Sequence, residues 1–119
     1  MDAPVNLQAA LATIDEPWTP LTVATVNDYD ARVARIEGDF DWHRHPETDE
    51  LFLVLSGEMT IKMDEGDVHL STGDVYVVPQ GRRHCPSAPS GATILMLEPS
   101  ATVNTGDAES ALTKPRRLY

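Results

Sequence analysis

Three histidines and one glutamate are the residues of this chain best suited to chemistry. His43 and His45 are separated by one residue, Glu50 follows five positions later, and His84 lies far along the chain. Alternate side chains of a β-strand share a face, so both imidazoles of the pair point the same way on a strand and diverge on a helix. Neutral imidazoles with a carboxylate suit a first-row transition metal. The pattern therefore predicts a metal site, provided that strands position it.

The local signals around these residues are mostly those of short strands. Runs rich in β-branched and apolar residues alternate with turn residues such as Glu65-Gly66, Gly73 and Pro79-Gln80-Gly81. The predicted strands cover residues 21–26, 29–37, 50–55, 59–63, 67–70, 75–78 and 94–97, with a turn at Ser56-Gly57. Short strands with turn signals about every 8–12 residues predict an all-β sandwich or barrel.

A short helix is expected before the strands. Leu7, Leu11 and Ile14 lie at helical spacing, and Asn6 suits the N-cap position. The prolines that begin at Pro17 end this pattern, because proline removes a backbone donor.

The chain divides into three parts of different pattern. Residues 1–20 form an N-terminal helix and arm, residues 21–99 form the barrel, and residues 100–119 form a C-terminal tail. The tail has weak periodicity and carries Pro115, so it lies either along the surface or across a partner subunit.

Two motifs resemble those of the cupin superfamily of small jelly-roll barrels. The members of the first are Gly38, His43, His45, Glu50 and Gly57, with HxH, four residues, Glu, six residues and Gly as its core spacing. The members of the second are Gly73, Pro79, Gly81 and His84. The strand pattern extends the likeness to roughly residues 21–99. The segment from His45 to Glu50 also resembles small single-domain cupins often labelled mannose-6-phosphate-isomerase-like.

Two positions depart from the family pattern. Four residues separate Gly38 from His43, where the family has five, and Ala88 replaces the terminal asparagine of the second motif. Neither position is a metal ligand in the family, so the departures bear on the loops around the site.

The resemblance implies a single-domain cupin jelly-roll β-barrel with a short N-terminal helix and one divalent transition-metal ion. Its ligands would be His43, His45, Glu50 and His84. Zinc, iron, manganese, nickel and copper all suit this donor set.

Two alternatives to this ligand set stay open. The paired histidines could lie on the surface beside Trp42 and Arg44. Glu47 or Asp49 could replace Glu50 as the carboxylate ligand, although the spacing favours Glu50.

Four further residues are candidates to line a cavity: Trp42, Phe52, Tyr76 and Met96. Core packing is the alternative for each, and we favour it for Phe52 and Met96. Tyr76 is also the candidate proton donor, the one catalytic role assigned outside the ligand set. Cys85 directly follows His84, so on a strand its side chain faces away from the site and is expected to be a buried apolar residue.

Three arginines near the motifs have two interpretations. Arg44, Arg82 and Arg83 could extend the positive field of a metal ion and favour an anionic or chelating ligand. They could instead offset surface acids, an interpretation that we favour for at least two of the three. The acids concerned are Glu37, Asp39, Asp41 and Asp49.

Composition narrows the partners of this chain of 119 residues. Nineteen acidic residues against nine Lys and Arg give a formal charge of −10, which argues against nucleic acid and against an anionic membrane surface. The longest apolar run, residues 51–55, is too short to span a bilayer. One cysteine and no secretion signal favour a cytoplasmic location. Exposed edge strands favour a homodimer.

The sequence supports two classes of function. The first is a metal-dependent enzyme of dioxygenase, isomerase/epimerase or lyase type that acts on an anionic or chelating small molecule. The second is a non-catalytic module that holds a small molecule or metal as a sensor or store. A structural barrel that a metal merely staples together is a third version.

Overall fold

The computed structural model describes residues 3–119, and nearly all of its regular elements are strands. The elements are α1 (Leu7–Leu11), β1 (Leu21–Val26), β2 (Tyr29–Asp39), β3 (Glu50–Met63), β4 (Val68–Ser71), β5 (Val75–Val78) and β6 (His84–Pro99). The all-β prediction with one short N-terminal helix is therefore confirmed. In the described part of the chain, no helix has the length and apolar character needed to cross a membrane.

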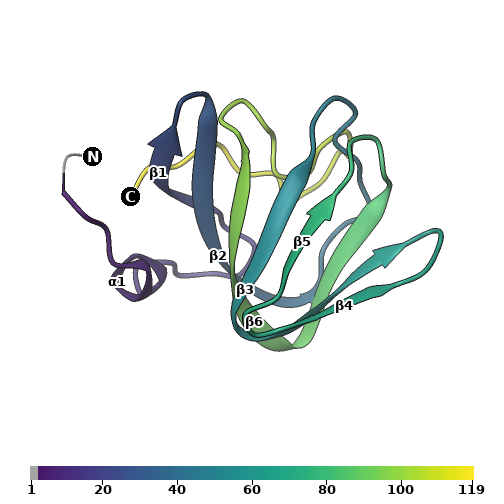
Figure 1. Cartoon of the computed structure of the whole chain (residues 1–119), viewed down its shortest axis with the longest axis horizontal. Coiled ribbons are helices and arrows are strands. Elements are labelled where there is room, and N and C mark those ends of the chain that lie inside the picture. Colours follow the sequence, from purple (N-terminus) through teal and green to yellow (C-terminus); the bar gives the residue numbers. More distant parts are fainter. Residues whose placement is uncertain (1–2) are drawn as a thin grey trace.

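The strands form one antiparallel sheet that curls on itself (Figure 1). Its strand order is β1-β2-β6-β3-β4, and β5 also pairs with β3. The long strand β6 pairs with the end of β3 at His84 and with the start of β3 near Leu97. Because β2 and β3 both follow β6 along its length, their side chains face a common interior.

Two strands are longer than their local patterns predict. Residues 94–97 are only the apolar end of β6, which begins at His84. The predicted turn at Ser56-Gly57 is wrong, because β3 continues through it with irregular register. Gly57 has φ +80, and a Cβ there would lie 2.5 Å from the Gly91 carbonyl oxygen. Glycine here permits a bulge against β6, so a turn signal marks a bend within one strand.

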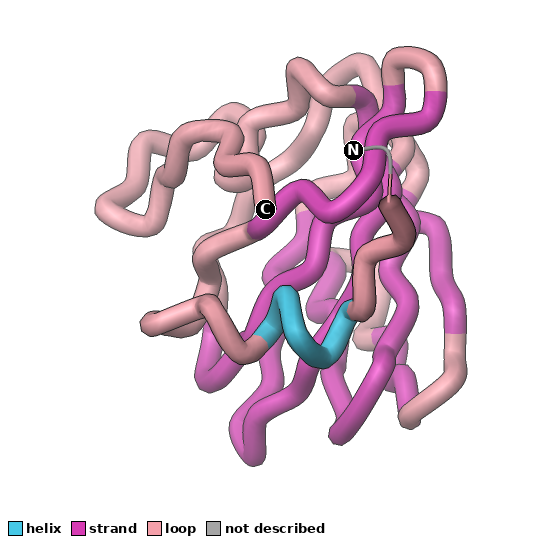
Figure 2. The backbone as a smooth tube through the Cα atoms, turned by 90° about the vertical axis from the view of Figure 1, so that its left-hand side faces the viewer, coloured by secondary structure: helices cyan, strands magenta, loops and turns pink. Residues whose placement is uncertain are grey.

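Apolar residues fill the barrel and also cover part of its outer face. Inside, the residues at one end include Val54, Met59, Ile61 and Leu70, each at most 2% exposed. Outside, α1 lies against the sheet (Figure 2) and belongs to a second apolar cluster that includes Val33. Asn6 caps the helix as predicted, because its side chain accepts a hydrogen bond from the Ala9 N–H at 2.9 Å.

The C-terminal segment, residues 100–119, crosses one end of the barrel and returns to β1 (Figure 1). The Thr22 N–H donates to the Arg117 carbonyl at 2.8 Å, and the Tyr119 N–H donates to the Thr22 carbonyl at 2.9 Å. Between these ends, the Asp107 N–H donates to the Arg44 carbonyl at 3.1 Å. The segment thus binds along the barrel of its own chain, the first of the two courses that the sequence leaves open.

Candidate metal centre

Three separate segments bring the four predicted ligands together. His43 and His45 lie in the connection between β2 and β3, Glu50 is the first residue of β3, and His84 is the first residue of β6. His43 and His84 exchange two backbone hydrogen bonds of 2.9 and 2.8 Å. One donor atom from each of the four side chains lies within 4.8 Å of all the others, and all four residues are buried. The donors converge as the motif spacing predicts.

Backbone carbonyls fix the orientation of two imidazole rings. Nδ1 of His43 donates to the Asp41 carbonyl at 2.8 Å, and Nδ1 of His84 donates to the Arg82 carbonyl at 2.9 Å. A neutral ring that carries its proton on Nδ1 keeps its Nε2 lone pair free for a metal ion. Nε2 of His45 is buried 3.4 Å from Glu50 Oε1 but makes no hydrogen bond among the described residues, an arrangement that is costly unless something else satisfies it. The donor set therefore fits a cation.

The charge states of the cluster also favour a cation. Burial, and then the neighbouring His84, lower the pKa of His43 to about 4, so the ring is neutral at pH 7. Burial alone would raise the pKa of Glu50, but its hydrogen bond with Glu98 and its interactions with His45 and His84 hold that pKa well below the usual range. A neutral His43 ring beside a carboxylate that ionises readily matches the protonation states that metal binding requires.

Sequence reasoning missed a second buried acid beside the cluster. Glu98 is 1% exposed, and its Oε1 accepts a hydrogen bond from Arg32 Nη1 at 3.0 Å. Burial and the negative charge of Glu50 raise the pKa of Glu98 well above its usual range. The neighbouring buried carboxyls thus have their pKa values displaced in opposite directions, Glu50 downward and Glu98 upward. A period-2 signal existed, because Ile94, Met96 and Glu98 share the inward face of β6.

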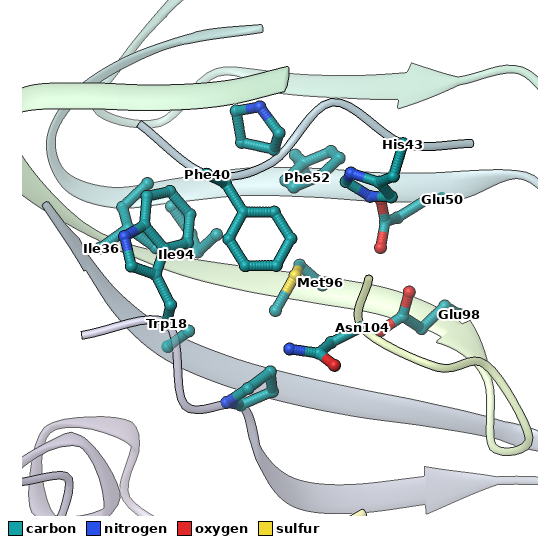
Figure 3. Close-up of a pocket in the computed structure, with 13 residues that line it drawn as sticks. Trp18, Ile36, Phe40, His43, Glu50, Phe52, Ile94, Met96, Glu98 and Asn104 are labelled. Carbon is teal, nitrogen blue, oxygen red and sulfur yellow. The ribbon is translucent and has the colours of Figure 1, made fainter. Parts of the chain in front are cut away.

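A small, mostly apolar cavity of about 30 Å³ adjoins the cluster (Figure 3). Its apolar wall includes Trp18, Ile36, Phe40, Phe52, Ile94 and Met96. His43, Glu50, Glu98 and Asn104 supply its polar groups. Phe52 and Met96 thus line the cavity and belong to the packed core as well. A compact ligand would meet apolar walls on one side and the four donors on the other.

The other two cavity candidates lie elsewhere. Trp42 is 38% exposed, and the guanidinium of Arg83 lies 4.4 Å from the centre of its ring. Tyr76 is on β5, partly buried against the core, and is not among the described residues that line the cavity. The role of Tyr76 as a proton donor therefore stays a prediction from the sequence. Cys85 is buried, outside the ligand group, and its Sγ donates to the Phe40 carbonyl at 3.2 Å, in line with its predicted role.

The three arginines near the motifs pair with surface acids. The ion pairs are Arg44–Asp107 at 3.5 Å, Arg82–Glu65 at 3.6 Å and Arg83–Asp64 at 3.1 Å. The arginine side chains are 44 to 48% exposed, and none lines the cavity. The interpretation as surface arginines holds for all three, with partners other than those expected. They supply no inward positive field.

The alternative carboxylate ligands are also outside the cluster. Asp49 is exposed, and its Oδ1 accepts a hydrogen bond from the Gln80 N–H at 2.8 Å, which ties the loop before β3 to the turn before β6. Glu47 is exposed as well. Glu50 is the carboxylate that the fold places among the three histidines.

A small antiparallel barrel with three histidines and one glutamate converging inside it defines a class of β-barrel with a metal-binding group. The chain belongs to the cupin family, since the sequence model of the cupin domain matches residues 32–98, more than half of the chain. It is similar to the uncharacterized protein YdbB of Bacillus subtilis (strain 168), with 38% identity over 80 residues that cover 66% of this chain and 71% of that protein.

Three further proteins are similar to this chain in sequence or in fold. A cupin-2 domain containing protein from Shewanella frigidimarina NCIMB 400 is 34% identical, with TM-score 0.78 over 80% of this chain and 93% of that one. The 3-hydroxyanthranilate 3,4-dioxygenase of Ruegeria pomeroyi is 36% identical over 73 residues, 57% of this chain but only 40% of the enzyme. Hydroquinone 1,2-dioxygenase PnpCD, solved with Cd²⁺ and 4-hydroxybenzonitrile, shares the fold at 21% identity and TM-score 0.68, covering 79% of this chain and 71% of that one.

Proposed function

We propose that this cupin is a metal-dependent enzyme that acts on a compact chelating molecule, and that its reaction is of the dioxygenase type. The observation that carries the proposal is the buried group of four donors within 4.8 Å, beside an apolar cavity. The similarity to a 3-hydroxyanthranilate 3,4-dioxygenase favours oxygen chemistry over the isomerase, epimerase and lyase alternatives.

The residues of the chain divide the work of such a site. His43, His45, Glu50 and His84 would hold one divalent ion, which when bound acts as a Lewis acid toward substrate oxygens and can activate dioxygen. The apolar wall would bind the body of the substrate and exclude water. Because Arg44, Arg82 and Arg83 face the surface, attraction for an anionic group rests on the ion alone.

Metal analysis tests the first half of the proposal. Elemental analysis of the purified protein should find about one transition-metal ion per chain, and His45→Ala and His84→Ala should lose it, because each removes one of four donors. His69→Ala is the matched control, since His69 is exposed and pairs with Glu58 outside the cluster. Equal metal content in the wild type, His84→Ala and His69→Ala would refute the site.

Oxygen uptake tests the second half. The iron-loaded protein should consume dioxygen with 3-hydroxyanthranilate or hydroquinone, and His84→Ala should not. The size of the cavity, about 30 Å³, favours a second candidate, a non-catalytic metal-binding module, because it holds only about two water molecules. Stoichiometric metal without oxygen uptake in the iron, manganese and nickel forms would select this candidate.

A homodimer is part of the same proposal, and the outer face of the sheet supports it. Two cross-strand rows on this face are apolar: Val77, Leu51 and Leu97 in one, and Val75, Leu53 and Leu95 in the other. Val75 and Val77 are 59% and 43% exposed. A second copy carries the same charge of −10, so an uncharged patch is where two copies can approach. Light scattering at micromolar concentration should give twice the monomer mass, and Val77→Lys should lower the measured mass to that of the monomer. A monomeric wild type would contradict the dimer.

A further inference from the structure

A series of buried charges leads away from the candidate ligand Glu50. The carboxyl groups of Glu50 and Glu98 face one another at the polar side of the cavity (Figure 3). Arg32 Nη1 donates to Glu98 Oε1 at 3.0 Å, and Arg32 Nη2 donates to Asp30 Oδ2 at 3.2 Å. The side chains of Glu98, Arg32 and Asp30 are at most 4% exposed. The carboxyls and the guanidinium therefore form one continuous buried path.

The C-terminal segment closes this path at its outer end. Arg116 donates to both oxygens of Asp30, from Nε at 2.7 Å and from Nη2 at 3.1 Å. The same segment reaches Arg32 directly, because the carbonyls of Ser100 and Thr102 accept from Nη2 at 2.8 Å and from Nη1 at 2.9 Å. The guanidinium of Arg32 is thus held between Glu98, Asp30 and the backbone of the C-terminal segment.

Fold stability alone is a poor reason for this arrangement. Replacing buried ion pairs with apolar residues of similar size is often neutral or stabilising. Here two carboxyls also lie side by side, and the second oxygen of Glu98 has no hydrogen-bond partner among the described residues. Nε of Arg32 has no partner among the described residues either. The series is costly to bury, and its inner end touches a candidate metal ligand.

We propose that Glu98 is a positioning residue of the metal centre, and that the C-terminal segment sets its position through Arg116, Asp30 and Arg32. This inference rests on the proposed metal site. Partners of metal-bound carboxylates orient them, and their loss commonly weakens metal binding by about 10–100-fold. Without Arg116, Asp30 would hold Arg32 more strongly, the Arg32–Glu98 bond would loosen, and Glu50 would lose its fixed partner. A surface residue would thereby control a buried centre.

Arg116 is the residue on which to test the proposal. Glu98→Leu removes one of the two carboxylate partners of the buried Arg32 and risks misfolding. The Arg116 side chain is 42% exposed, so Arg116→Gln leaves the core intact. Arg117→Gln is the matched control, because Arg117 is exposed and its side chain makes no ion pair among the residues that the structure describes. Arg116→Lys keeps the charge. The probe is Co²⁺, measured by competition with a chromophoric chelator and by the visible spectrum of the loaded full-length protein.

The expected result is about tenfold weaker Co²⁺ binding and an altered visible spectrum in Arg116→Gln. Arg117→Gln should match the wild type, and Arg116→Lys should recover most of the affinity. A purely structural Arg116 would lower the thermal midpoint and leave spectrum and affinity unchanged, which would overturn the inference. It would also be overturned if Arg116→Lys behaved as Arg116→Gln does. If the wild type bound no Co²⁺, the proposed function itself would fail, which is a distinguishable outcome.

Discussion

The two ends of the barrel interior are equally buried but chemically opposite. At one end, Val54, Met59, Ile61 and Leu70 form an apolar core, each at most 2% exposed. At the other end, the four candidate ligands, Glu98 and Arg32 are each at most 6% exposed. Burial alone therefore does not distinguish core from site. At the polar end, oriented donors and charges stand where apolar side chains would pack, so this end gains less free energy from apolar burial.

The same strands supply both ends. The inward face of β3 begins with Glu50 and continues through Phe52 and Val54, and that of β6 passes from Ile94 and Met96 to Glu98. Each inward apolar series thus meets a carboxyl at one end. We therefore expect two separable effects on the free energy of unfolding: one from truncating side chains at the apolar end, and one from protonating groups at the polar end.

Truncation in the apolar end should have the largest effect on stability. Ile61 is fully buried, so Ile61→Ala should lower the free energy of unfolding by about 2–5 kcal/mol through lost burial and the cavity left behind. Urea unfolding with and without a chelator should give the same loss, because the substitution changes no charge and removes no candidate ligand. Val26→Ala at the exposed end of β1 is the control, expected within about 0.5 kcal/mol of the wild type. A loss for Ile61→Ala that vanished with the chelator would break the comparison between the two ends.

The sequence predicts the presence of the strands and the ligand set. It predicts less well the full length of β3 and β6 and the role of Glu98. Motif spacing identifies His43, His45, Glu50 and His84 because each ligand is tied to a turn or strand start. The course of β3 through Gly57 is not readable locally, since the bulge depends on Gly91 of β6 across the sheet. Tertiary pairing overrides a local turn signal there.

Glu98 shows a different limit. Its inward position follows from strand alternation, but its partners come from β2 and from residues far along the chain. The ion pair with Arg32 joins residues 66 positions apart, and Arg116 reaches Asp30 across 86 positions. No spacing rule covers such pairs. The C-terminal segment, which has no periodic pattern, could not be placed from sequence for the same reason.

Lowering the pH should have the next largest effect on stability, and it should act through the polar end. The pKa of His43 in the folded chain is about 4, below its usual 6.5, chiefly because the ring is buried. Between these values the unfolded chain binds more protons, so the contribution of His43 to stability is present above pH 6.5 and is lost as the pH falls toward 4. The difference corresponds to about 3 kcal/mol. It should appear in the chelator-treated protein when urea unfolding is followed from pH 7 to pH 4.

The variant His43→Asn isolates this contribution, because Glu50, Glu98 and the surface acids titrate in both proteins. The stability of the wild type relative to the variant should shrink by about 3 kcal/mol over that pH range. Ile61→Ala should shift the whole curve without changing its slope. Parallel curves for wild type and His43→Asn would mean that the ring is not kept neutral by burial.

The contact between the C-terminal segment and the candidate ligand loop should give the smallest effect. Gly106 has φ +57, and a Cβ there would collide with the Arg44 carbonyl oxygen and lie 3.1 Å from Cδ2 of His43. Gly106→Ala should therefore lower the free energy of unfolding by about 2 kcal/mol, from left-handed strain and from the displaced contact. Chelators should also remove the metal faster, because the segment no longer holds the loop.

Gly73→Ala separates strain from contact. Gly73 also has a positive φ, +89, but a Cβ there would have nothing within 4 Å. It should cost about 1 kcal/mol and leave the rate of metal release unchanged. The excess loss in Gly106→Ala then measures the contact with the loop of His43. If both variants released metal at the wild-type rate, the C-terminal segment would cover the polar end without fixing the loop of His43. The barrel strands alone would then set the geometry of that end.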